Sequence, residues 1–138
     1  EMGPVGASSA SAESRLALYI EAFKRFAQRA PHFPFMMLRE EMGGGEHIED
    51  DVLASFLQFF SLDRKIMEQG EREGVFRPVN PHAAHLSLVG AIIFFLVSHP
   101  VRDGGGEVRG LPADNPVFDE YVEHVRKLFL SGVRAEAR

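Results

Sequence analysis

The chain has 138 residues and a mass of 15.4 kDa, a length that suits one domain. Apolar residues make up 45% and charged residues 25%, which is ordinary for a globular protein with a real core. Cysteine is absent, which excludes disulfide frameworks, thiolate metal sites and cysteine nucleophiles. The net charge of −5 provides no basic patch, so we do not expect this chain by itself to bind DNA or RNA.

The missing cysteines favour the cytoplasm slightly, and the first residue suggests a piece of a longer protein. The longest apolar run, residues 88–97, is too short to cross a bilayer, and no signal peptide is recognisable at the start. The sequence begins with Glu1 rather than methionine. Residues 1–12 are rich in glycine, alanine and serine, so we expect a flexible linker there and one folded domain over residues 13–138.

The first half of the sequence predicts three helices. Over residues 12–30 the apolar residues recur on one helical face, and Pro31 ends the pattern. A short helix follows over residues 33–42, before three consecutive glycines. The acidic stretch 46–51 suits the start of a third helix, which we expect to run to about Gln69 with Gly70 as its C-terminal residue.

Two further helices complete the prediction. Asn80 and Pro81 are good starting residues for a helix that reaches about residue 99 and is apolar nearly all round from 86 to 97. Such a helix must be buried on every side, and in a domain this small a partner subunit is the economical cover. After a glycine-rich loop at 100–115, the last helix spans about residues 115–135. Because no strand pattern appears, the expected fold is all-α, a five-helix bundle.

Residues 65–99 carry a family resemblance. A helix ends there in the phrase I..G...G.FR, and a proline-bearing turn then leads into a helix rich in small residues. These features are formed by Ile66, Gly70, Gly74, Phe76, Arg77, Pro81, Ala83, Ala84, Leu86 and Gly90. In this phrase, and in helix order over roughly residues 13–135, the chain resembles the C-terminal ligand-sensing domain of TetR-family transcriptional regulators.

The resemblance implies a protein in two parts. An N-terminal helix-turn-helix domain, which this sequence lacks, binds DNA, and the C-terminal domain forms a homodimer and holds a small effector. The last two helices of each subunit pair as a four-helix bundle. The expected function is therefore the sensing and dimerisation half of a transcriptional regulator, most often a repressor, released by a largely apolar or aromatic small molecule.

Large apolar residues on the first three helices are the candidate ligand-binding residues, with Tyr19 and His85 as polar anchors and Gln58 as a further possibility. The competing interpretation is that these side chains simply form the core. The candidates are Tyr19, Phe23, Phe26, Phe35, Met36, Phe56, Phe59, Phe60, Met67 and His85.

The candidate dimer interface comes from the last two helices. Periodicity does not indicate which face of the helix over residues 80–99 meets the partner. The candidates are Leu88, Ala91, Ile92, Phe95, Phe118, Tyr121, Val122, Val125, Leu128 and Phe129.

The sequence gives little support for a metal site or an enzyme. His82 and His85 share a helical face, but no third ligand is evident, and the acidic cluster from Glu46 to Asp51 is better explained as helix N-terminal charge. No serine lies in a G-x-S-x-G context, and neither glycine run is a phosphate loop. We therefore expect no cofactor and no catalysis.

Two other functions stay open. A helical protein-interaction module without a small-molecule ligand would use the aromatic helices as its interface. A helical enzyme or metal protein would use His82 and His85.

Overall fold

The structure is a computed structural model that describes residues 10–98 and 117–136. Within those residues the chain forms helices and no sheet, which confirms the predicted all-α class. The helices are α2 (Ala12–Arg29), α3 (Phe33–Met42), α4 (Asp50–Glu73), α5 (Pro81–Val97) and α7 (Phe118–Val133).

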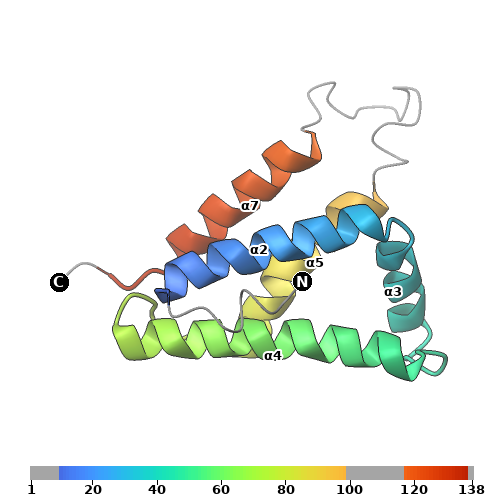
Figure 1. Ribbon diagram of the computed structural model, residues 1–138, viewed down its shortest axis with the longest axis horizontal. Helices are drawn as coiled ribbons and strands as arrows, with labels where there is room; N and C mark the ends of the chain where they lie inside the picture. Colours follow the sequence, from blue (N-terminus) through green and yellow to red (C-terminus); the bar gives the residue numbers. More distant parts are fainter. Residues whose placement is uncertain (1–9, 99–116, 137–138) are drawn as a thin grey trace.

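The helices stack in three levels (Figure 1). The long helix α4 forms one side and α7 the other, while α2 and α5 lie between them and each contacts both. The short helix α3 connects the end of α2 to the start of α4, and it packs against α5. As a result α5 contacts α3, α4 and α7, which gives it the most neighbours in the described bundle.

Local capping chemistry explains where the helices begin. The Ser11 hydroxyl accepts a hydrogen bond from the backbone of Ser14 at 3.3 Å, and the Asn80 side chain accepts one from Ala83 at 3.0 Å. Asp50 and Asp51 place negative charge in the first turn of α4, where the helix dipole favours it. The starts of α2 and α5 therefore coincide with the predicted residues. The start of α3 does so as well, with a proline in its first turn and no side-chain cap.

The predicted end of α4 was wrong. The helix passes through Gly70 and ends at Glu73, with Gly74 in the left-handed conformation at φ 74°. Gly70 serves packing instead, because a Cβ atom there would lie 1.9 Å from Cδ2 of Phe76. The loop therefore begins at Gly74, four residues later than expected, and the Phe76 ring lies against the bare backbone of α4.

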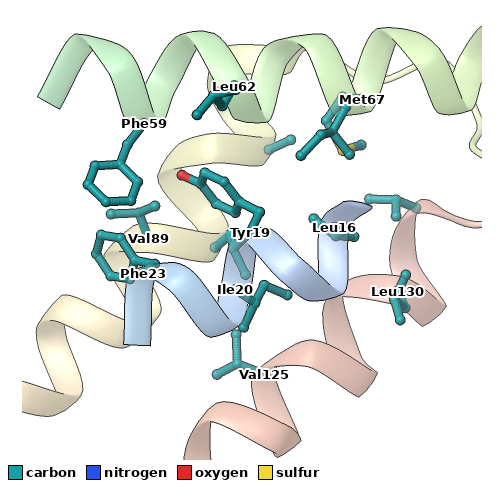
Figure 2. Packing of buried hydrophobic residues seen from close by; sticks show 14 of the residues in the cluster. Leu16, Tyr19, Ile20, Phe23, Phe59, Leu62, Met67, Val89, Val125 and Leu130 are labelled. Atoms are coloured by element: carbon teal, nitrogen blue, oxygen red, sulfur yellow. The ribbon is translucent and has the colours of Figure 1, made fainter. Parts of the chain in front are cut away.

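A core of apolar side chains fills the space between the levels (Figure 2). Aromatic rings concentrate where α2 meets α4: the centroid of Phe59 lies 5.2 Å from that of Phe23, 5.4 Å from Phe26 and 6.0 Å from Tyr19. Edge-to-face contacts of this kind stabilise beyond the area they bury. Leu16 and Tyr19 are fully buried in this core.

The start of α2, the end of α4 and the end of α7 converge at one corner of the molecule (Figure 1). The backbone amide of Ala12 donates to Glu73, and the guanidinium of Arg134 lies 2.9 Å from the carboxylate of Glu13. The backbone of Arg77 donates to Val133 at 2.8 Å, beside an isolated antiparallel bridge between residues 76 and 134. Three segments distant in sequence are thus bonded together.

Some expectations fall beyond the described residues. The glycine-rich loop at 100–115 and residues 1–9 of the expected linker lie outside them. Ser11 and Ala12, the last residues assigned to that linker, form the N-cap and first turn of α2. In the part of the chain that is described, no helix is long and apolar enough to cross a membrane.

Candidate functional site

A buried polar pair lies between α4 and α5. Nδ1 of His85 is 3.1 Å from Oδ2 of Asp63, and both side chains are almost completely withdrawn from solvent. The residues share the apolar faces of their helices with Ile66, Leu88 and Val89, so the pair is embedded in the core. Buried charge is costly unless it is paired, so this contact constrains both helices.

Aromatic rings surround the imidazole. Phe56 and Phe60, one turn apart on α4, present their rings edge-on to His85 at centroid distances of 6.3 and 5.1 Å. Phe60 also contacts the ring of His82, the exposed histidine one turn earlier on α5. These rings hold His85 in one orientation and keep water away from most of its surface.

His85 lies in the wall of a cavity of about 160 Å³ between α3, α4 and α5. Apart from the imidazole, the wall is almost wholly apolar, and its one formally charged side chain is the exposed Glu41. The lining residues are Met37, Leu38, Glu41, Phe56, His85, Leu86, Val89, Gly90 and Ile93. Ligand sites are mostly apolar with a few oriented polar groups, and this pocket has that composition at a smaller volume than most of them.

Two further polar atoms are buried without a hydrogen-bond partner in the described residues: the Tyr19 hydroxyl and Oδ1 of Asp63. Burial raises the pKa of Asp63 above its usual value, and the hydrogen bond and charge of His85 offset only part of that rise. Burial, and next the charge of Asp63, raise the pKa of Tyr19 well beyond its usual range. Tyr19 is therefore a neutral phenol at physiological pH.

A larger groove of about 620 Å³ runs along the other side of α5, between it and α7. Ala84, Ser87 and Ala91 form its wall on α5, while Tyr121 and Leu128 are among its residues on α7. The Tyr121 hydroxyl donates to the carbonyl of Ala91 at 3.2 Å and so ties the two helices together. Leu128 is 65% exposed, so the groove presents apolar surface outward.

A third hollow, of about 250 Å³, lies between α3 and the start of α4. Its wall includes Met36 and Met37, but polar groups such as Arg39, Glu40 and His47 supply much of the remainder. The backbone of His47 donates to Glu40 across it at 3.2 Å. This hollow lacks the buried, oriented polar atom that distinguishes the pocket at His85.

The predicted ligand residues fall into separate places. Phe56 and His85 line the 160 Å³ pocket, with Phe60 beside the imidazole. Met36 lines the third hollow, and Phe35 is exposed on α3. The others lie in or against the core, namely Tyr19, Phe23, Phe26, Phe59 and Met67. Gln58 is exposed on α4.

The predicted dimer residues also divide into two sets. Ala91, Tyr121, Val125, Leu128 and Phe129 line the groove between α5 and α7. The remaining five lie in this chain's own packed interior or against it, namely Leu88, Ile92, Phe95, Phe118 and Val122.

Other residues of α5 are exposed. Leu86 and Phe94 are 59% and 69% exposed, and Gly90 lies between them in sequence. Leu86 and Gly90 also line the 160 Å³ pocket.

Asp63 is the site residue that sequence reasoning missed. It falls on the buried stripe of α4 with Phe59, Ile66 and Met67, at spacings of three and four residues. A carboxylate on an otherwise apolar helical stripe was the available signal, because such a group needs a buried partner.

Within the described residues, no group of three or more histidine, aspartate or glutamate side chains is placed to hold a metal ion. In that part of the chain, Asp63 and His85 therefore have no third potential metal ligand beside them. Comparisons with protein-family models, with curated proteins and with solved structures found no match.

Proposed function

We propose that this chain is the effector-sensing and dimerisation domain of a TetR-like transcriptional regulator, a cytoplasmic repressor released by a largely apolar small molecule. One observation carries the proposal: α5 separates a small apolar pocket from a larger, mostly apolar groove. His85, Val89 and Ile93 face the pocket, whereas Ala84 and Ala91 face the groove. A helix with a ligand site on one side and an interface on the other can couple the two.

The groove supports the dimerisation half of the proposal. Small residues on α5 allow another helix to approach closely, the exposed Leu128 supplies apolar area in the groove, and the exposed Phe94 supplies more elsewhere on α5. Pairing α5 and α7 with their copies would bury surface in the obligate-dimer class, above about 2,000 Å² in total.

The proposed mechanism is a population shift. A ligand in the pocket contacts α5 and α3, so it favours those positions of α5 that keep the pocket open. Because α5 also forms the groove, the same ligand favours one arrangement of two subunits over another. In the protein that carries the DNA-binding half, DNA and ligand must then weaken each other's binding by the same factor.

Native mass spectrometry of the chain tests dimerisation. We expect the wild-type chain to be a dimer. We expect Leu128→Glu to be a monomer with unchanged helical circular dichroism, because dimerisation through the groove would bury the charge of the new glutamate. The matched control is Leu57→Glu, which changes a 54% exposed leucine on α4, away from the groove. A wild-type monomer at all concentrations, or dissociation by both substitutions, would refute dimerisation through this groove.

A competition titration tests the coupling in the protein that includes the DNA-binding half. The expected result is that bound DNA lowers the affinity for ligand and that bound ligand lowers the affinity for DNA by an equal factor. Two independent affinities would remove effector control from the proposal.

One observation favours a second function, a helical protein-interaction module without a ligand. Tyr19, Phe23, Phe59 and Met67 are buried in the core, where the ring of Phe59 contacts those of Tyr19 and Phe23. Exposed apolar side chains on α3 and α4, such as Phe35 and Leu53, would then contact a protein partner. A thermal-shift screen distinguishes the functions, since the module predicts no stabilisation by any small molecule.

A further inference from the structure

The imidazole of His85 has one nitrogen already committed. Nδ1 bonds Asp63, and in the described residues Nε2 has no hydrogen-bond partner. The ring lies in the wall of the 160 Å³ pocket, so Nε2 is the polar atom that the imidazole can offer a ligand there. The hydrogen bond between Asp63 and Nδ1 orients the ring. Carboxylates commonly orient histidines in this way when the other ring nitrogen binds a ligand.

The volume of the pocket matches about one ring. An enclosed apolar cavity of about 150 Å³ is known to admit benzene, and this pocket, which opens to solvent beside Leu86 and Glu41, has a similar volume. The walls contributed by Phe56, Val89 and Ile93 are apolar, so they match the faces and edges of an aromatic ring. A single aromatic ring is therefore the ligand whose size matches the pocket.

The charges around the pocket restrict the polar group. Glu41 is the formally charged residue of the lining, and its carboxylate disfavours an anionic ligand such as a benzoate. A hydroxyl group is both donor and acceptor, so it can bond Nε2 whether that nitrogen carries a proton or a lone pair. A neutral hydroxyl therefore satisfies the site in either protonation state of the Asp63–His85 pair.

We propose that this pocket binds a small neutral phenol, with the ring between α3, α4 and α5 and the hydroxyl hydrogen-bonded to Nε2 of His85. Asp63 is the positioning residue, which holds the imidazole through Nδ1. The proposal rests on the proposed function in one respect, that the chain binds a small molecule, and it requires neither dimerisation nor DNA.

The test compares phenol with toluene by NMR titration of the labelled chain. Both rings fill the same volume, but toluene cannot hydrogen-bond. We expect phenol to shift the Nε2 resonance of His85 and the amides of the lining, with saturation. In His85→Phe the ratio of phenol to toluene affinity should fall about tenfold, which corresponds to about 1.4 kcal/mol.

The matched control is His82→Phe, which changes an exposed histidine outside the pocket that contacts the same Phe60. That variant should keep the wild-type affinity ratio. Because His85→Phe leaves Asp63 without its partner, the double variant Asp63→Leu/His85→Phe serves if the single one fails to fold. Replacing both partners by apolar groups of similar size leaves no buried charge unpaired.

Asp63→Asn tests the positioning role separately. A merely structural aspartate would change stability alone. A positioning aspartate also changes the imidazole, so we expect altered tautomer-sensitive nitrogen shifts of His85 together with weaker phenol binding.

Three outcomes would overturn the proposal: no shift at the pocket with phenol, an unchanged affinity ratio in His85→Phe, or loss of the preference in His82→Phe as well. A dimer that ignores phenol would refute this inference and leave dimerisation intact. A monomer that binds phenol would refute dimerisation and leave this inference intact.

Discussion

At the scale of single residues, the phrase that carries the family resemblance has a structural explanation. Ile66 is fully buried, Gly70 makes room for the ring of Phe76, and Gly74 adopts a left-handed conformation. Nε of Arg77 donates to the carbonyl of Gly132 at 2.7 Å, which ties the loop to α7. Phe76 and Arg77 thus join the end of α4 to the end of α7. None of the five residues of the phrase lines the 160 Å³ pocket, whereas Leu86 and Gly90, from the helix that follows it, do.

The first prediction concerns Gly70. Gly70→Ala places a methyl group inside the Phe76 ring position, and we expect it to lower the free energy of unfolding by about 1–3 kcal/mol or more, as overpacked sites do. Gly132→Ala is the matched control, because a Cβ there meets nothing within 4 Å and alanine favours helix by up to about 1 kcal/mol. Urea unfolding measures both, and equal effects would contradict the packing role of Gly70.

The second prediction concerns Asp63 and pH. The folded-state pKa of Asp63 is raised above 3.8, so the folded protein takes up this proton at a higher pH than the unfolded chain does. The contribution of Asp63 to stability is therefore greatest at low pH and is lost as pH rises through the folded pKa.

Urea unfolding of wild type and Asp63→Asn at several pH values measures this effect. The free energy of unfolding of wild type minus that of the variant should grow as pH is lowered from 7 toward about 4. A difference that stays constant or shrinks over this range would show that the folded-state pKa of Asp63 is not raised.

Site residues could be predicted only in part, because burial and partner choice depend on contacts between distant segments. His85 was a candidate because of its residue type on an apolar helix, but its partner lies 22 residues away on another helix. Phe56 and Phe59 have the same residue type and lie one turn apart on α4, yet one lines the pocket and the other fills the core. No local pattern separates them.

At the scale of elements, helix starts were predictable and one helix end was not. A start is set by a cap within three residues, as at Asn80, so the sequence contains its cause. The end of α4 depends instead on the approach of Phe76, which made Gly70 a packing residue within the helix. The facing of α5 was also unpredictable, because a helix that is apolar all round has no preferred side.

The third prediction tests the cap of α5. Asn80→Ala removes the acceptor for the backbone amide of Ala83, and we expect it to cost about 1 kcal/mol of stability. Asn80→Asp should leave stability close to wild type, because aspartate caps about as well as asparagine. Thermal unfolding of the three proteins makes the comparison, and a destabilised Asn80→Asp would indicate that the amide group has another role.

At the scale of the whole molecule, the helix order was predictable but the three-level stacking was not. Contacts such as Arg134 with Glu13 join residues at opposite ends of the described chain, and periodicity carries no information about them. Nor could periodicity predict that α5 would border two hollows of different kinds. The sequence predicted the elements, whereas long-range packing decided the site.

The fourth prediction follows from the open groove. If two subunits pair there, unfolding includes dissociation, so the thermal midpoint depends on protein concentration. For a dimer of this size we expect a rise of about 2–3 °C for each tenfold increase in concentration. Differential scanning calorimetry at three concentrations measures it, and Leu128→Glu should show no such dependence. A concentration-independent wild type would mean that the chain folds as a monomer.

The length of α4 has a mechanical consequence. Its 24 residues make a rod of about 36 Å, with Phe56 at the pocket near one end. At the other end Gln69 donates a hydrogen bond to the carbonyl of Ala10, and Glu73 accepts one from the amide of Ala12, where the described residues begin. Asp63, bonded to His85 on α5, lies between these ends. One continuous helix therefore connects the pocket with the residues at which α2 begins, and any change at the pocket that shifted α4 would reach the start of α2 directly.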